Sequence, residues 1–341
     1  MEESGLKTVV GWILGNWIKL FIFTPLMTIL FLFIIFPFSD LKDVVTGVVA
    51  DATRNSVFLT YDDAGLSLSN GLGLKVDGVQ VEVSALPPIK LNSASFAPSI
   101  SAITAKAPLG SIGLSGLFRG DLSGNLGTVK SGNDQFFAVE TSADKIQLKS
   151  LLGYVKKANL VNSSFLPPSV LGDLNFDLKA TVDPSANVQP QGELRGVINK
   201  LNLESFTLSM KQRGGFTIDI EIPSLKFSKV NVVATMQERE VKITEVRMGE
   251  GNDGLKILMT GTMVAGLDKR GKAVQFSTGA FDFEFNMEFL TKALNDPDIQ
   301  NFYNYVDLGL SKCKTRTANG VRYKFRLAAR SFQTQALPKC I

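Results

Sequence analysis

The sequence predicts a mainly β protein: an elongated, curved antiparallel sheet with one N-terminal transmembrane helix and few short helices. Three observations lead to this prediction. From Val57 onward apolar and polar residues alternate in short runs, as in strands with one buried face. Pairs of turn-forming residues such as Asn319-Gly320 separate the runs, which is typical of hairpins. By contrast, Leu20–Phe38 contains nineteen residues and no charge.

Residues 1–38 are expected to form a membrane anchor. A helix over Leu20–Phe38 would be about 28 Å long at ~1.5 Å per residue, close to the thickness of a bilayer's hydrocarbon core. A buried helix of a soluble protein is the alternative, but such helices are rarely apolar on every side. A cleaved signal peptide fits less well, because no Ala-x-Ala motif follows the run. The residues expected to anchor the chain at the two interfaces are Trp12, Trp17, Lys19, Leu20 and Phe38.

The charges that flank this segment do not decide its orientation. Lys7 and Lys19 before the span balance Lys42 and Arg54 after it, and only the free amino terminus favours a cytoplasmic N-terminus.

Residues 39–56 are predicted to form an amphipathic helix. Ser39 or Asp40 can cap it, and Asp43 in the first turn favours the helix dipole. Its apolar face packs either on the end of the following domain, which we favour, or on the membrane surface; the polar face lacks the Lys and Arg typical of surface helices. The residues of this face are Leu41, Val44, Val45, Val48, Val49 and Ala52.

Residues 57–341 are predicted to form the β domain. The clearest alternating runs are Phe216–Ile222, Val230–Met236, Leu255–Met259, Phe281–Met287 and Val321–Leu327. Turns are expected at Asn70-Gly71, Asp77-Gly78, Gly214-Gly215, Asp253-Gly254 and Asn319-Gly320.

Two helices are expected inside this domain. They cover Thr141–Ala158 and Asn286–Val306, the second broken at Asp296-Pro297. The similar phrases LPPIKL and LPPSVL suggest two related halves that meet near residues 160–172.

The composition argues against catalysis, metal binding and nucleic-acid binding. The chain has no histidine, which removes the commonest general base and the commonest metal ligand. A net charge of +4 without a basic block argues against nucleic acid. Asp219 and Glu221 alternate with Ile218 and Ile220, so we read them as the solvent face of a strand. No phosphate-binding loop or nucleophile elbow is present, and we expect no enzyme and no cofactor.

The two cysteines, Cys313 and Cys340, cannot build a zinc site by themselves. In an oxidising compartment they could form one disulfide; the alternative is two separate thiols.

Several stretches share an alternating strand with glycine at its start or exit: GSIGLSGLFRGDLSG, VLGDLNFDLKATVD, GELRGVINKLNLESFTL and KVNVVATMQEREVKITEVRMGEGNDGLKILMTGTMVAG. Together with the anchor and the segment FPFSDLKDVVTGVV, this layout resembles the inner-membrane protein N of bacterial type II secretion systems and, more broadly, the AsmA-like proteins. The resemblance covers most of the chain, but the Cys313–Cys340 segment has no counterpart. It implies a single-pass protein of the bacterial inner membrane whose bulk lies in the periplasm. It also implies a sheet shaped as an AsmA-like groove or taco, whose concave apolar face can hold lipid.

The function expected from this resemblance is that of a non-enzymatic accessory component of a type II secretion system. The alternative is an AsmA-like envelope protein that binds or transfers lipid, and a third reading is an envelope enzyme with an unusual active site. The expected partners are the membrane, other type II secretion proteins and lipid, without nucleic acid. The residues expected to line the groove are Ile218, Ile220, Val232, Phe283 and Phe285.

Overall fold

The structure of the protein is a computed structural model. It describes residues 27, 43, 46–47, 50–51, 57–67, 73–83, 86–99, 109–131, 134–158, 167–183, 188–211, 217–251, 253–270, 273–331 and 336–341. Except for Met27, the predicted membrane anchor lies outside these residues. Among the residues that are described, no helix has both the length and the apolar character needed to cross a membrane.

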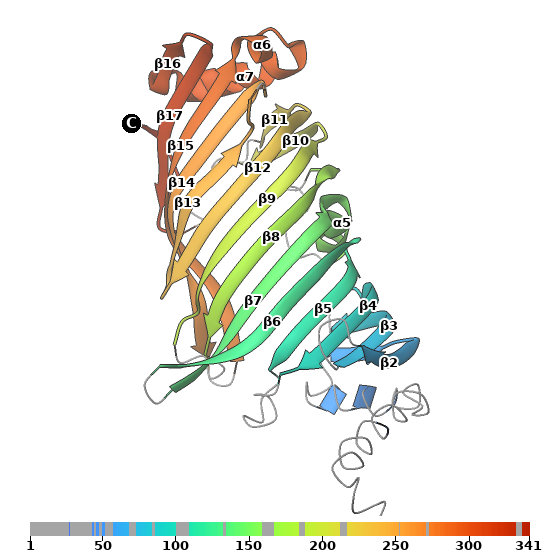
Figure 1. Cartoon of the computed structure of the whole chain (residues 1–341). Coiled ribbons are helices and arrows are strands. Elements are labelled where there is room, and N and C mark those ends of the chain that lie inside the picture. Colours follow the sequence, from blue (N-terminus) through green and yellow to red (C-terminus); the bar gives the residue numbers. More distant parts are fainter. Residues whose placement is uncertain are drawn as a thin grey trace, which may run out of the picture.

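One large antiparallel sheet makes up most of the described structure (Figure 1). Its strands are β1 (Val57–Thr60), β2 (Asp63–Ser67), β3 (Gly73–Val83), β4 (Ile89–Pro98), β5 (Gly110–Leu117), β6 (Gly120–Ser131), β7 (Asp134–Gln147), β8 (Val170–Val182), β9 (Gln191–Leu203), β12 (Leu225–Gln237), β13 (Glu240–Met248), β14 (Leu255–Arg270), β15 (Ala273–Leu290), β16 (Lys314–Thr317), β17 (Gly320–Ala329) and β18 (Lys339–Cys340). The predicted mainly β fold, a large antiparallel sheet with few short helices, is confirmed.

The order of strands in the sheet nearly repeats their order in the chain. It runs β1-β3-β4-β5-β6-β7-β8-β9-β12-β13-β14-β15-β17-β16, with β2 also pairing with β3 and β18 with β17. Between β9 and β12 the strands β10 (Phe206–Lys211) and β11 (Thr217–Ile222) form a separate two-stranded sheet. Two related halves were predicted to meet near residues 160–172; the strands on either side of the undescribed residues 159–166, β7 and β8, pair directly with each other.

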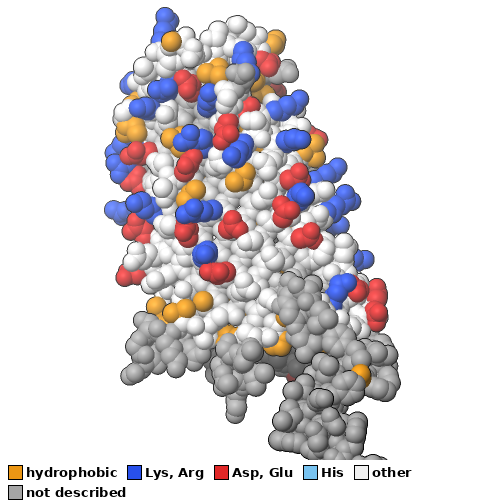
Figure 2. All heavy atoms as spheres, viewed as in Figure 1, with side chains coloured by type: hydrophobic (Ala, Val, Ile, Leu, Met, Phe, Trp, Pro, Cys, Tyr) orange, Lys and Arg blue, Asp and Glu red, His pale blue; other side chains and the backbone are white. Residues whose placement is uncertain are grey.

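The register gives the sheet one apolar and one polar face. Because side chains alternate along a strand, directly paired residues share a face. One such row across five neighbouring strands is formed by Gly196, Val232, Val246, Met259 and Phe285. The opposite face carries charged side chains, which Figure 2 shows scattered over the side turned to the viewer.

The helices are α5 (Leu148–Lys157), α6 (Thr291–Leu294) and α7 (Pro297–Leu310), followed by the 3-10 turn η3 (Ser311–Cys313). Two predicted helix starts are wrong. The helix expected from Thr141 starts at Leu148, and the one expected from Asn286 starts at Thr291, because β7 and β15 continue to those points. In both cases hydrogen bonding to two neighbouring strands outweighs local helix propensity.

The predicted turn at Asp77-Gly78 is also wrong, since both residues lie inside β3. At this point the partner of β3 changes from β2 to β1. Gly78 adopts a φ of +62°, and a Cβ there would lie 1.9 Å from an oxygen of Asp62. The glycine therefore bends a continuous strand instead of ending it.

Residues 39–56 were predicted to form a helix, and the few of them that are described are helical: Asp43, Thr46, Gly47, Ala50 and Asp51. Ala50 is buried, and the Thr46 hydroxyl donates a hydrogen bond of 2.8 Å to the carbonyl of Leu59 in β1. These contacts favour a helix that packs on the end of the β domain, which is the alternative preferred in the sequence analysis.

The largest core lies at one end of the sheet, where α7 and the β10–β11 hairpin cover the apolar face. Phe289 and Tyr323 are completely buried there, and their rings meet nearly perpendicularly at 6.1 Å. Tyr303 of α7 adds an edge-on contact of 5.3 Å with Phe289. Large aromatic side chains thus fill the space between α7 and this end of the sheet.

A polar network ties α7 to the strands below it. The Tyr323 hydroxyl donates a hydrogen bond of 2.5 Å to Asp307, and Lys314 lies 2.9 Å from the same carboxylate and 2.8 Å from the Tyr303 hydroxyl. The Tyr323 and Lys314 hydrogen bonds hold the pKa of Asp307 below its usual value. The disulfide between Cys313 and Cys340, with Cα atoms 4.8 Å apart, joins η3 to β18 beside this network.

The network makes the free energy of unfolding depend on pH in the acid range. Because the folded-state pKa of Asp307 is lowered, its contribution is complete above the unfolded pKa of about 3.9 and is lost as the pH falls through the folded value. We therefore expect the free energy of unfolding, measured in urea from about pH 5 down to about pH 2, to fall less steeply in Asp307→Asn than in the wild type.

The control is Asn304→Ala on the exposed side of α7, which removes no titrating group and should keep the wild-type slope. Equal slopes in Asp307→Asn and the wild type would show that the network does not couple stability to this carboxylate.

Candidate functional site

The middle of the apolar face is the candidate site. We call it the central apolar patch and define it by side chains from six strands that share this face: Ile112, Leu122, Phe176, Leu178, Leu194, Ile243, Val246 and Met259. Each is half-buried, and none belongs to the two packed clusters at the ends of the sheet. The patch is therefore an apolar surface held between two closed ends.

The two clusters define how far the patch extends. One is the aromatic core under α7, and the other is a small group around Tyr61, Val79 and Leu91 in the first strands. Near that second end Leu74 of β3, on the same face, is 41% exposed. Contiguous exposed apolar surface larger than a few hundred Å² normally marks a binding site.

Two glycines on the apolar face, Gly261 and Gly196, differ in the space around them. Gly261 of β14 has φ +146°, and a Cβ there would lie 2.1 Å from the backbone carbonyl oxygen of Asp282 in β15. Gly196 of β9 is also on this face, but a Cβ would find its nearest atoms at 3.8 Å. The two glycines share a face and differ in the room around them.

The sheet is bent around the β12–β13 turn. The β14–β15 hairpin extends beyond that turn, and the Ala265 amide donates to the Arg239 carbonyl at 2.9 Å. Farther along, the Gln189 side chain accepts from the amide of Leu267 and donates to its carbonyl, both at 2.8 Å. The Gln189–Leu267 hydrogen bonds thus join the segment before β9 to the end of β14, although β12 and β13 lie between these strands in the sheet. This cross-link holds the sheet in the curved shape seen in Figure 1.

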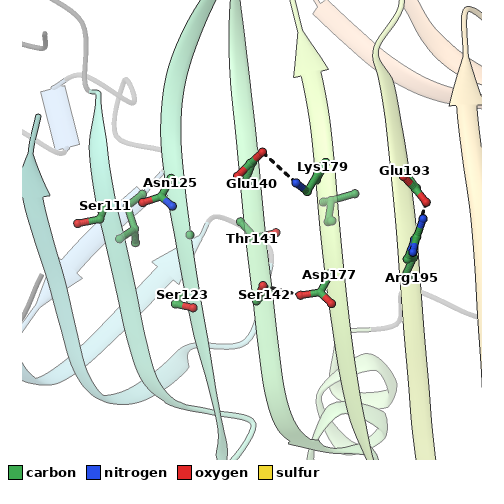
Figure 3. A pocket seen from close by; sticks show the side chains of 13 residues that line it. Ser111, Ser123, Asn125, Glu140, Thr141, Ser142, Asp177, Lys179, Glu193 and Arg195 are labelled. Carbon is green, nitrogen blue, oxygen red and sulfur yellow. Dashed lines mark hydrogen bonds and ion pairs between the residues drawn. The ribbon is translucent and has the colours of Figure 1, made fainter.

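The polar face carries a depression of about 890 Å³ over β5 to β9 (Figure 3). Its charged side chains neutralise one another: Lys179 lies 3.3 Å from Glu140, and Arg195 lies 2.6 Å from Glu193. The Ser142 hydroxyl donates to Asp177 at 2.5 Å. Exposed pairs of this kind contribute little each. Lys179–Glu140 and Ser142–Asp177 join the neighbouring strands β7 and β8, and Glu193–Arg195 lies within β9.

The described residues contain no group of three or more Cys, Asp or Glu side chains placed to hold a metal ion. The adjacent carboxylates Asp62 and Asp63 lie at the start of β2, which pairs with β3.

The sequence-predicted groove residues are only partly brought together. Val232, Phe283 and Phe285 share the apolar face, with Phe283 8% exposed. Ile218 and Ile220 do not join them, because β11 pairs with β10 in the separate hairpin, and their side chains lie outside the described part. The regular alternation in Thr217–Ile222 predicted a strand but could not say which sheet it joins.

The other predicted site residues have different outcomes. The anchor residues Trp12, Trp17, Lys19, Leu20 and Phe38 lie outside the described residues. Cys313 and Cys340 are paired. Sequence reasoning missed Phe176, Leu178 and Ile243 of the patch, although alternation in VLGDLNFDLKATVD and EVKITEV was a usable signal.

Comparisons with family models, curated proteins and solved structures found no match to the chain.

The two glycines of the apolar face allow a matched test of the close strand approach. Gly261→Ala places a Cβ against a backbone oxygen and should lower the free energy of unfolding by about 2 kcal/mol or more. Gly196→Ala has room and should change it by less than about 1 kcal/mol. Urea unfolding of both variants measures the difference; equal effects would contradict the geometry described for β14 and β15.

Proposed function

We propose that the protein binds lipid acyl chains on the central apolar patch and acts as an AsmA-like lipid-binding or lipid-transfer protein of the bacterial envelope. The observation that carries this proposal is the continuous apolar face, closed only at its ends. From β5 to β14 the patch crosses eight strands, roughly 35 Å at ~4.8 Å per strand. One bilayer leaflet of hydrocarbon is about 15 Å thick, so the face is long enough for acyl chains.

The energetics suit a surface that exchanges lipid with a membrane. Each methylene removed from water gains about 0.8 kcal/mol, so a chain laid on the patch is strongly favoured over one in water. Moving the same chain from a bilayer to the patch is nearly neutral, because both surroundings are apolar. A carrier needs this balance, since it must both accept and release its cargo.

The rest of the proposal places this domain in the cell. Residues 20–38 anchor the chain in the inner membrane, and the β domain lies in the periplasm. The Cys313–Cys340 disulfide supports an oxidising compartment, because disulfides persist there and are rare in the cytosol. The accessory role in type II secretion stays a prediction from resemblance; the apolar patch is the feature that favours lipid.

A photoactivatable phospholipid with the reactive group in its acyl chain tests the proposal. In the full-length protein, crosslinked peptides should map to β13 and β14, and Ile243→Glu should reduce this labelling about tenfold because a carboxylate on the patch is costly to bury under lipid. Lys242→Glu changes the adjacent residue on the opposite, exposed face and should label like the wild type. Labels confined to residues outside the sheet, or equal labelling of both variants, would refute the proposal.

A further inference from the structure

A second cavity lies at the ends of strands β4 to β7, between those strand ends and α5. It measures about 720 Å³, and three segments line it: the β3–β4 connection, the β5–β6 turn and one side of α5. It shares no lining residue with the polar depression in Figure 3 or with the central apolar patch.

The inner part of this cavity is apolar and adjoins the apolar face. The rings of Phe118 and Tyr154 meet in it at 5.4 Å, and Pro87 and Pro88 form part of its wall. Ile89 lines the cavity and also packs against the cluster around Tyr61, Val79 and Leu91 on the apolar face. Ile89 therefore links the lining of the cavity to the apolar cluster at this end of the sheet.

The rim of the cavity is positively charged. Lys90, Arg119, Lys149 and Lys157 line it, and no Asp or Glu does. Within the described part of the chain none of these four cations forms an ion pair, unlike Lys179 and Arg195 of the polar depression. Figure 2 shows Lys and Arg side chains gathered at the side of the molecule where Figure 1 places α5. Unpaired cations around an apolar pocket complement an anionic amphiphile.

The helix keeps this space open. Gly153 lies in the middle of α5, where glycine weakens a helix, and a Cβ there would meet nothing within 4 Å. Packing therefore does not require a glycine at this position. Neighbouring Lys156 is turned elsewhere, since its ammonium group donates to the carbonyls of Pro167 and Pro168 at 2.6 and 2.8 Å.

We propose that this cavity binds the phosphate group of an anionic phospholipid whose acyl chains lie on the apolar face. This inference rests on the proposed function and adds to it a head-group preference. The four cations contact the phosphate, and the Phe118–Tyr154 wall receives the first part of the acyl chains.

The test compares two soluble short-chain lipids with identical tails, dihexanoyl phosphatidylglycerol and dihexanoyl phosphatidylcholine, by calorimetric titration of the full-length protein in a neutral detergent. The wild type should prefer the anionic lipid by about tenfold. The double variant Lys149→Gln/Lys157→Gln should lose most of this preference and keep its affinity for phosphatidylcholine. Lys226→Gln/Lys242→Gln makes the same charge change at exposed positions away from the cavity and should behave like the wild type.

A second variant tests the space instead of the charge. Gly153→Leu fills the cavity and should reduce phosphatidylglycerol affinity about tenfold without changing any charge. An unchanged affinity would place the ligand elsewhere and overturn the inference.

The remaining outcomes separate this inference from the proposed function. Equal binding of both lipids by the wild type overturns the head-group site and leaves acyl-chain binding intact. Inorganic phosphate that binds as tightly as phosphatidylglycerol would identify a site for a free anion and overturn the lipid assignment. If neither lipid binds and the crosslinking test also fails, both proposals are wrong.

Discussion

The constraint on which this structure depends is that a single layer of strands must satisfy every backbone group while only one of its faces is apolar. Hydrogen bonds between neighbouring strands solve the backbone problem across sixteen strands. They leave open what covers the middle of the apolar face. Among the described residues, α7 and the β10–β11 hairpin cover one end of this face and the cluster around Tyr61 closes the other, so few elements are left for the middle. The half-buried patch between the closed ends follows directly from that shortage of covering elements.

The closed ends and the open middle have different chemistry for a physical reason. At the end near the disulfide, Phe289 and Tyr323 are fully buried, and the Tyr323 hydroxyl finds Asp307 as its acceptor. A tyrosine can be buried in this way only where a hydrogen-bond acceptor is placed for its hydroxyl, because an unpaired buried hydroxyl is costly. The central patch contains aliphatic side chains, Phe176 and Met259, none of which has a polar tip. A surface of that kind can bind chains of varying length because no hydrogen bond has to be matched.

The two cavities that carry charged side chains show how charge balance distinguishes ordinary surface from a candidate binding site. In the depression on the polar face, Glu140 and Glu193 neutralise Lys179 and Arg195. At the cavity beside α5, the cations come from separate segments and no lining carboxylate opposes them. Their convergence is a consequence of the fold, because the β5–β6 turn and α5 meet only once β7 has paired with β6.

The sequence by itself determined the class of structure and the pairing partners that lie close together. Alternation with a period of two is a local property, so the strands around Val232, Val246 and Phe285 and the turn at Asn319-Gly320 could be read directly. Only the tertiary structure decided where β7 and β15 give way to helix, since hydrogen bonds to two neighbours extend those strands past good helix-forming residues. The tertiary structure also decided that Ile218 belongs to the separate hairpin, and it brought Lys90, Arg119 and Lys149 together around one cavity. The reason is that long-range contacts determine which sheet a strand joins and which distant segments meet, and no local sequence pattern contains that information.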